Sequence, residues 1–123
     1  MDLLTFQLDG TRYALPLDAV AEVLVAPAVR RVPAGPPGVL GLAEACGRIV
    51  AVLDLAELLG RSAPPGAPRH LVRFAPPHDR SALAVGQPLG TGTGTPGAGH
   101  VVIAGVPHVL LDTAELLKRA SGG

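Results

Sequence analysis

The strongest constraint on the fold of this chain is a short pattern that occurs twice. Val52 to Arg61 reads V-L-D-L-A-E-L-L-G-R, and Leu110 to Arg119 reads L-L-D-T-A-E-L-L-K-R. In each copy an apolar, strand-like run leads to an Asp that is followed three residues later by a Glu, which is the spacing of a helix capping box. The leucines that follow lie on one helical stripe. The repeat therefore predicts two copies of one structural unit, each made of a strand and a capped helix.

The first copy opens with the apolar run Ile49 to Leu53, which is typical of a strand covered on both faces. Near the N-terminus, apolar and polar residues alternate on both sides of Asp9-Gly10. This pair tolerates the positive φ angles of a type I′ turn and predicts a β-hairpin. The residues expected in the first core are Leu4, Phe6, Leu8, Tyr13, Ile49, Val50 and Val52.

Further elements follow from local patterns. Asp18 is expected to cap a short helix over Ala19 to Leu24, and the second copy of the repeat should likewise end in a capped helix. The segment from Gly86 to Gly99 holds six glycines, two prolines and three threonines, and is predicted to be a loop that buries nothing. The remaining predicted strands are Val29 to Val32, Val39 to Ala43, two around Val72 and Leu83, His100 to Ala104, and Val106 to Leu111.

These elements predict a mainly β protein with two small subdomains in one domain of residues 1–123. The first subdomain spans about 1–61, the Pro-rich segment 62–69 is the crossover, and the second subdomain spans about 70–123. The loop at Gly86 to Gly99 leaves the second subdomain shorter than the first.

Composition limits the classes of partner. Ten basic and ten acidic residues cancel, so no charged stripe is expected to attract nucleic acid or an anionic membrane. No apolar run is long enough for a membrane span, and no charged-then-apolar leader opens the chain, so we expect a cytoplasmic protein without membrane insertion. The single cysteine, Cys46, excludes an internal disulfide. The expected partner is another protein.

Candidate catalytic or cofactor-binding residues have simpler interpretations. Gly92-x-Gly94-x-x-Gly97 matches a dinucleotide fingerprint, but Pro96 interrupts it and no helix is expected after it. Cys46 could act as a nucleophile only with a nearby His and an orienting group, and its position in a turn equally suits a replaceable surface residue. Asp54, Glu57, Asp112 and Glu115 are explained by capping, and the spacing of the four histidines, His70, His78, His100 and His108, does not fit a metal site. We expect no enzyme activity, no cofactor and no metal.

The order of hairpin, V-A-E-V stretch, Pro/Gly turn, G-V-L-G-L and G-R-I-V-A-V-L-D-L resembles the CheW family, the coupling proteins of bacterial chemosensory arrays. The resemblance covers most of the chain. It implies two small five-stranded β-barrels of SH3-like topology that pack together. The residues that match the family motif are Gly38, Val39, Leu40, Leu42, Gly47, Ile49, Val50, Val52, Asp54 and Leu55.

Three differences from the family pattern affect the expected function. The Asn and Arg of the motif are replaced by Gly41 and Ala43, or by Glu44 or Ala45 and Cys46, depending on the register. Ala51 stands where the family has proline. A helix and a strand of the second barrel are reduced to the segment from Gly90 to Gly99, which predicts a truncated second barrel. A short member of a Frz-type gliding-motility system fits this description.

The resemblance implies a non-catalytic adaptor that binds a chemoreceptor cytoplasmic segment and, more weakly, a CheA-type histidine kinase. The expected partner-binding residues line a groove between the barrels, although Val20 and Val23 are equally well explained as packing residues of a helix. Two alternatives remain open: a module that binds receptor or kinase without coupling them, and a small ligand-binding protein or enzyme. The expected partner-binding residues are Val20, Glu22, Val23, Gly38, Val39, Gly47 and Arg48.

Overall fold

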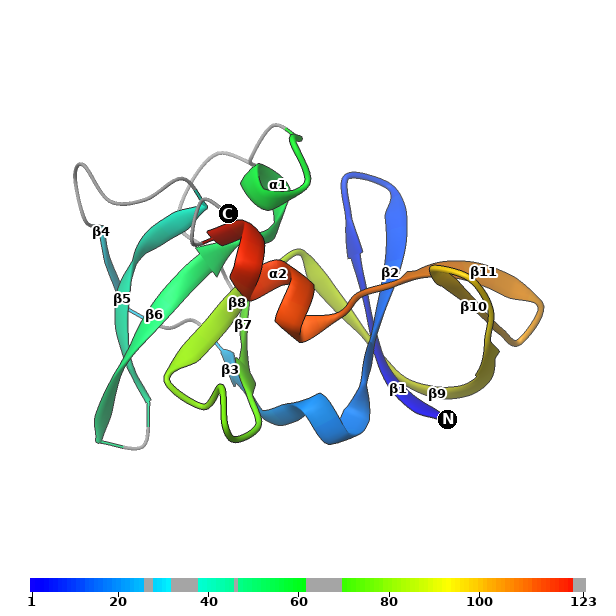
Figure 1. The fold of residues 1–123 in the computed structure, drawn as a ribbon, viewed down its shortest axis with the longest axis horizontal. Coiled ribbons are helices and arrows are strands. Elements are labelled where there is room, and N and C mark those ends of the chain that lie inside the picture. The colour runs from blue at the N-terminus through cyan, green and yellow to red at the C-terminus, as the bar shows by residue number, and fades with distance from the viewer. Residues whose placement is uncertain (26–27, 32–37, 46, 62–69, 121–123) are drawn as a thin grey trace.

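A computed structural model describes residues 1–25, 28–31, 38–45, 47–61 and 70–120. These residues form a mainly β protein with short helices, as predicted (Figure 1). The helical elements are η1 (Leu17–Ala19), α1 (Leu55–Leu58) and α2 (Thr113–Ala120). The strands are β1 (Asp2–Leu8), β2 (Thr11–Pro16), β3 (Val20–Val25), β4 (Val29–Arg31), β5 (Val39–Ala45), β6 (Arg48–Asp54), β7 (His70–Phe74), β8 (Ser81–Val85), β9 (Gln87–Pro96), β10 (His100–Ile103) and β11 (Val106–Leu110).

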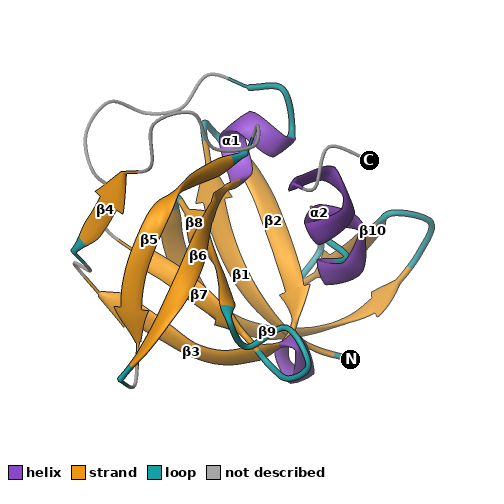
Figure 2. Cartoon of the chain, turned by 60° about the vertical axis from the view of Figure 1, so that its left-hand side comes forward, coloured by secondary structure: helices purple, strands orange, loops and turns teal. Residues whose placement is uncertain are grey.

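The strands form two sheets. One is a closed barrel in the order β1-β2-β11-β10-β9, and the other is a six-stranded, barrel-like sheet in the order β3-β7-β8-β6-β5-β4. In Figure 1 the barrel lies on the right, the six-stranded sheet on the left, and α2 between them. Figure 2 shows the curvature of the six-stranded sheet. In the described part of the chain, no helix has the length and apolar character needed to cross a membrane.

Each sheet combines a hairpin from one half of the chain with strands from the other half. The β1-β2 hairpin pairs with β9 and β11, whereas β7-β8 pairs with β3 and β6. The pairing is equivalent in the two sheets, because β2 runs parallel to β11 and β8 runs parallel to β6. The duplication is therefore present, but the predicted division into subdomains 1–61 and 70–123 is wrong for the sheets, since each one combines strands from both halves. The predicted crossover at 62–69 lies outside the described residues.

The predicted hairpins form. Asp9 and Gly10 have φ angles of 51° and 77°, so both central residues of the turn take the positive values of a type I′ turn. The hairpins β7-β8 and β10-β11 also form, and β5 continues to Ala45 before the turn at Gly47. Short-range turn signals therefore predicted these elements correctly.

The helix predicted over Ala19 to Leu24 is absent. The single turn η1 ends at Ala19, and Val20–Val25 forms β3, which pairs antiparallel with β7. The segment V-A-E-V-L-V is a short apolar run that satisfies both helical and strand spacing. Its β-branched residues favour a strand when a partner strand is available, and β7 provides that partner.

The segment from Gly86 to Gly99 is not a loop. Gln87–Pro96 forms β9, which pairs with β1 and β10 and closes the barrel, so the predicted truncation of the second barrel is wrong. The strand alternates glycine and threonine from Gly90 to Thr95. A side chain on Gly92 would meet the Ile103 side chain at 2.7 Å, and one on Gly94 would meet the Val101 side chain at the same distance. Gly92 and Gly94 therefore face the barrel interior, where the larger side chains of Ile103 and Val101 already fill the space.

Replacing Gly94 by Ala should destabilise the barrel. The added Cβ would lie 2.5 Å from the Val102 backbone oxygen and 2.7 Å from the Val101 side chain. Relieving both contacts requires movement of β10, and overpacking of this kind costs about 1 to 3 kcal/mol. Urea denaturation measures the loss, with Thr95→Ala on the exposed face of the same strand as the control. Equal stability of the two variants would contradict a packed barrel interior.

Both capped helices of the repeat are present. The Asp54 carboxylate accepts a hydrogen bond from the Ala56 backbone N–H at 3.1 Å, and the Asp112 carboxylate accepts one from Ala114 at 2.9 Å. Gly60 ends the first helix with a φ of 70°. The capping interpretation of the two aspartates is therefore confirmed.

Asp112→Ala should lower the free energy of unfolding by about 0.5 to 2 kcal/mol, because the first turn of α2 loses its cap. Asp112→Asn is the matched control, since an asparagine side chain retains an oxygen acceptor. Thermal unfolding followed by circular dichroism compares the two variants. An equal loss in both would exclude capping as the reason.

The apolar core lies mainly between the barrel and the six-stranded sheet. Both sheets and both helices contribute to this central core, and a smaller cluster lies inside each sheet. The core prediction is correct for Val50 and Val52, which are buried inside the six-stranded sheet, but wrong for Ile49, whose side chain is 69% exposed. The central core contains the predicted residues Leu4, Phe6, Leu8 and Tyr13 together with Leu15, Leu53, Leu55, Ala56, Val72, Phe74, Leu83, Val85, Leu111, Leu116 and Ala120.

Candidate partner-binding surface

Strand β3 carries three of the predicted partner-binding residues. Val20 is half-buried and packs against the central core, whereas Val23 is 38% exposed. Between them, a register shift in the pairing with β7 places Glu22 opposite Arg73. Val20 therefore packs against the core, as expected if it were not a partner-binding residue, but it does so from a strand and not from the predicted helix. Val23 and Glu22 remain accessible from solvent.

Glu22 belongs to a network of charged residues at one end of the six-stranded sheet. Arg73 Nε donates to Glu22 Oε1 at 2.7 Å, and the two side chains are only 17% and 30% exposed. Arg73 Nη1 also donates to the Asp79 backbone oxygen at 3.4 Å. Arg48 Nη1 lies 3.3 Å from Asp79 Oδ2. We call these four residues the β3–β6 charge network, because they connect β3 through β7 and the β7-β8 turn to β6.

The network brings together predicted residues that are distant in sequence. Glu22 on β3 and Arg48 on β6 are joined through Arg73 and Asp79, and Gly47 precedes Arg48 in the β5-β6 turn with a φ of 73°. A positive φ favours glycine at this turn, so the role of Gly47 is conformational. Within the network, Arg73 pairs with Glu22 and Arg48 pairs with Asp79.

Gly38 and Val39 lie away from this network. Val39 pairs with Leu53 at one end of the β5-β6 hairpin, whereas Arg48 pairs with Ala45 at the other end. Gly38 is buried, has a φ of 85°, and has no room for a side chain beside Leu58 of α1. Its backbone oxygen accepts a hydrogen bond from the Asp54 N–H at 2.8 Å. Gly38 therefore packs the end of β5 against α1, and the structure does not bring it together with Glu22.

Sequence reasoning missed Arg73 and Asp79. Arg73 is an isolated charge within the apolar strand β7, where a charge normally needs a partner. That signal was available in the sequence. The identity of the partner was not, because the pairing of β3 with β7 joins residues that are 51 positions apart.

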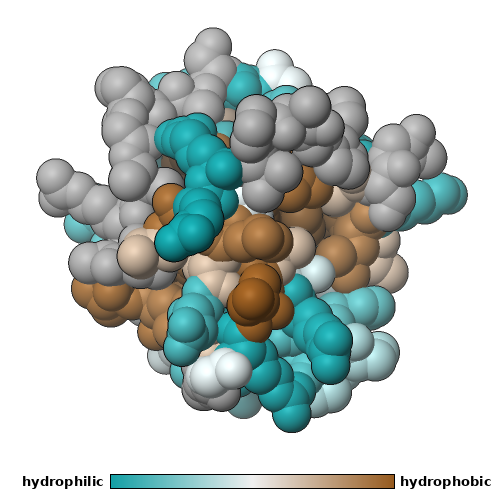
Figure 3. Space-filling model, turned by 90° about the vertical axis from the view of Figure 1, so that its left-hand side faces the viewer, coloured by the Kyte–Doolittle hydropathy of each residue, from teal (hydrophilic) through white to brown (hydrophobic). Residues whose placement is uncertain are grey.

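The outer face of the six-stranded sheet combines apolar and charged groups. Figure 3 views this face and shows apolar side chains at its centre, with hydrophilic side chains below them and at their upper left. The exposed apolar residues of these two strands are Leu42 and Ile49, which are 39% and 69% exposed.

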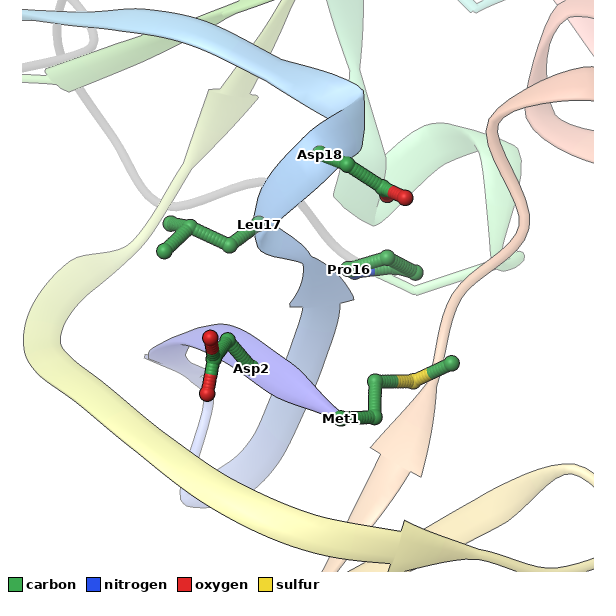
Figure 4. Close-up of a pocket in the computed structure, with 5 residues that line it drawn as sticks. All are labelled: Met1, Asp2, Pro16, Leu17 and Asp18. Carbon is green, nitrogen blue, oxygen red and sulfur yellow. The ribbon is translucent and has the colours of Figure 1, made fainter.

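An open pocket lies near the connection between β2 of the barrel and β3 of the six-stranded sheet. It is lined by Met1 and Asp2 from the start of β1 and by Pro16, Leu17 and Asp18 from the end of β2 and from η1 (Figure 4). None of the predicted site residues lines it, although β3 begins only two residues after Asp18. Its lining combines apolar side chains with two carboxylates.

The remaining chemical candidates are dispersed or structural. Gly92 and Gly94 lie in β9, so the dinucleotide-like motif does not lead into a helix. His108 is buried in the barrel with Nδ1 2.9 Å from the Val106 oxygen, whereas His70 and His100 begin β7 and β10. Among the described residues, no group of three or more His, Cys, Asp or Glu side chains could hold a metal ion. Cys46 lies outside the described residues.

Comparison with known proteins agrees with the fold. The model of the CheW-like domain matches residues 2–85. The crystal structure of the scaffolding protein TtCheW from Thermoanaerobacter tengcongensis matches with a TM-score of 0.78 at 16% sequence identity, covering 94% of this chain and 90% of that chain. No curated protein sequence matches the chain. Because the family model covers more than half of its residues, the chain belongs to the CheW-like domain family.

Proposed function

We propose that this protein is a non-catalytic adaptor of a bacterial chemosensory array and that it binds the cytoplasmic segment of a chemoreceptor. The observation that carries this proposal is the family match over residues 2–85, the part of the chain that contains β3 and the β3–β6 charge network. The structural likeness to a scaffolding protein over most of both chains supports the same class of function. An adaptor of this kind acts in the cytoplasm, recruited to the receptor array.

The charge network suggests how a receptor segment is recognised. Glu22 and Arg48 present opposite charges at one end of the sheet. Arg73 holds Glu22 through a charge-assisted hydrogen bond, and Asp79 pairs with the exposed Arg48. A fixed arrangement of charges loses less side-chain entropy on binding than free side chains do. We propose that Glu22, Val23 and Arg48 contact the receptor and that Val20 and Gly47 shape this surface, whereas Gly38 and Val39 lie at the other end of the β5-β6 hairpin and are not part of it.

A CheA-type histidine kinase is the second proposed partner. The sequence suggested weaker kinase binding, because a glycine-rich loop would have to be ordered at the interface. That reason does not apply to a preformed strand, and β9 pairs with neighbours on both sides. The fold therefore provides no entropic reason for weak kinase binding.

Separate titrations of the purified chain with a receptor cytoplasmic segment and with the regulatory domain of a CheA-type kinase, both from the same genome, test the proposal. Saturable binding to both identifies a coupling adaptor. Binding to only one identifies a module that does not couple them, which was the alternative from the sequence. Binding to neither, with a metal or nucleotide found by mass spectrometry of the purified protein, would contradict the adaptor function.

A further inference from the structure

The six-stranded sheet has two terminal strands, β3 and β4. Among the described residues each of them pairs with a single neighbour, which is β7 for β3 and β5 for β4. Figure 2 shows β3 along the lower rim of the sheet, with β7 above it. A terminal strand presents a row of backbone N–H and C=O groups along its outer edge, and these groups can pair with another extended chain.

Strand β4 has the features of a protected edge, whereas β3 does not. β4 is only three residues long, and its Arg30 and Arg31 are both exposed. Short length and charged side chains both discourage the addition of a further strand. β3 has six residues and contains no Lys, Arg or Pro. Its one charged residue, Glu22, is bonded to Arg73 at 2.7 Å and is therefore not directed to the outer edge as a guard.

The exposed side chains of β3 are suited to a neighbouring strand. Val23 and Val25 lie two positions apart, so they share one face of the sheet. They are 38% and 73% exposed. β-Branched side chains pack well against the side chains of an adjacent strand, and in the described part of the chain only β7 provides such neighbours. β3 therefore combines a free backbone edge with exposed valines beside it.

We propose that the outer edge of β3 binds an extended segment of another protein, which adds to the sheet as a further strand. An extended backbone satisfies a row of N–H and C=O groups, whereas the backbone groups of a helix are already paired within the helix. The segment should carry apolar side chains at alternate positions, where they pack beside Val23 and Val25. It should place no acidic side chain beside Glu22, because like charges on neighbouring strands repel each other.

A second copy of this chain meets the charge requirement less well. In an antiparallel pair of two β3 strands, a twofold axis through Glu22 places the two carboxylates directly opposite each other. An axis through Val23 makes them diagonal neighbours across the two strands, which is still within reach of long side chains. A segment of another protein with an uncharged or basic residue beside Glu22 avoids both arrangements.

A probe peptide tests strand addition without receptor or kinase, so its result is separate from that of the adaptor titrations. The probe is a short peptide of alternating valine and threonine with a lysine at each end, because these residues favour an extended strand. NMR titration of the isotope-labelled protein should show saturable shifts at the backbone amides of β3. The same peptide with every backbone nitrogen methylated keeps its side chains but loses its N–H donors, and should bind at least about tenfold more weakly.

Two matched variants locate the binding edge. Val25→Lys adds to β3 the kind of side chain that protects sheet edges, and should weaken binding of the probe at least about tenfold. Ile49→Lys is the control, because Ile49 is an exposed β-branched residue on β6, which pairs with β5 and β8 on its two sides. It should bind the probe as the unchanged protein does. Circular dichroism establishes that both variants are folded, as expected for substitutions of exposed residues.

The proposal would be overturned by a probe that does not bind, by equal binding of the methylated probe, or by an equal loss of affinity in the two lysine variants. Sedimentation velocity of the protein alone examines the alternative occupant. A dimer that Val25→Lys abolishes would show that a second copy, and not another protein, pairs with β3.

Discussion

Phe6→Ala should lower the free energy of unfolding by about 3 to 5 kcal/mol, the range for removing a buried aromatic side chain. Phe6 is fully buried, and its ring stacks on Tyr13 of β2 with the centroids 5.9 Å apart. It belongs to the central core, which both sheets and both helices share. The cavity left by the missing ring would therefore weaken the packing between the barrel and the six-stranded sheet, so both sheets would be destabilised.

Urea denaturation followed by circular dichroism measures this loss, and Ile49→Ala is the control. Ile49 lies on the outer face of β6 and is 69% exposed, so its truncation should change stability by less than about 0.5 kcal/mol. Because each sheet contains strands from both halves of the chain, the two sheets should unfold together, and Phe6→Ala should still show a single unfolding transition. A loss in Ile49→Ala as large as that in Phe6→Ala would contradict the observed orientation of β6, and two separate transitions would contradict a shared core.

Glu22→Arg should reduce the affinity for a receptor cytoplasmic segment by at least about tenfold, which corresponds to about 1.4 kcal/mol. The substitution removes the acidic group of the proposed binding surface. It also places a second cation beside Arg73, where the present pair is joined at 2.7 Å and is largely shielded from solvent. Isothermal titration calorimetry with the receptor segment measures the affinity, and thermal unfolding of the same samples detects any loss of structure.

Two further variants separate recognition from stability. Glu115→Arg reverses the charge of an exposed residue on α2, which pairs with Arg119 at 3.4 Å, and should leave receptor affinity unchanged. The double variant Glu22→Arg/Arg73→Glu re-forms the ion pair with its charges exchanged but loses the hydrogen bond from Arg73 to the Asp79 oxygen, so stability should recover in part and receptor affinity should not. Recovery of both would show that Glu22 acts only through Arg73 and does not contact the receptor.

Local chemistry accounts for the features that could be predicted from the sequence. The Asp9-Gly10 turn, the caps at Asp54 and Asp112, and the final hairpin depend on residues within a few positions of one another, and all are present. The repeat also predicted two equivalent units, because a strand and its following helix carry the same pattern in both copies.

Two features of the candidate surface depend on the tertiary structure. Val20, Glu22 and Val23 were assigned to a helix, because a short apolar run does not show which strand will pair with it. Gly38 matches the family motif, and the structure buries it beside Leu58. The charge network was not visible in the sequence, since Glu22 and Arg73 meet only through the pairing of β3 with β7. Sequence similarity identifies a motif residue without showing whether it is exposed.

Long-range pairing was decided by the tertiary structure alone. The sequence shows two hairpins and two sets of following strands, but it does not show that each hairpin pairs with the strands of the other repeat. The burial of Val50 and the exposure of Ile49 depend on which face of β6 is covered. The alternating glycines and threonines of β9 form a strand because β1 and β10 supply hydrogen-bond partners on both sides. At Gly92 and Gly94, the side chains of Ile103 and Val101 fill the space that a larger residue would need.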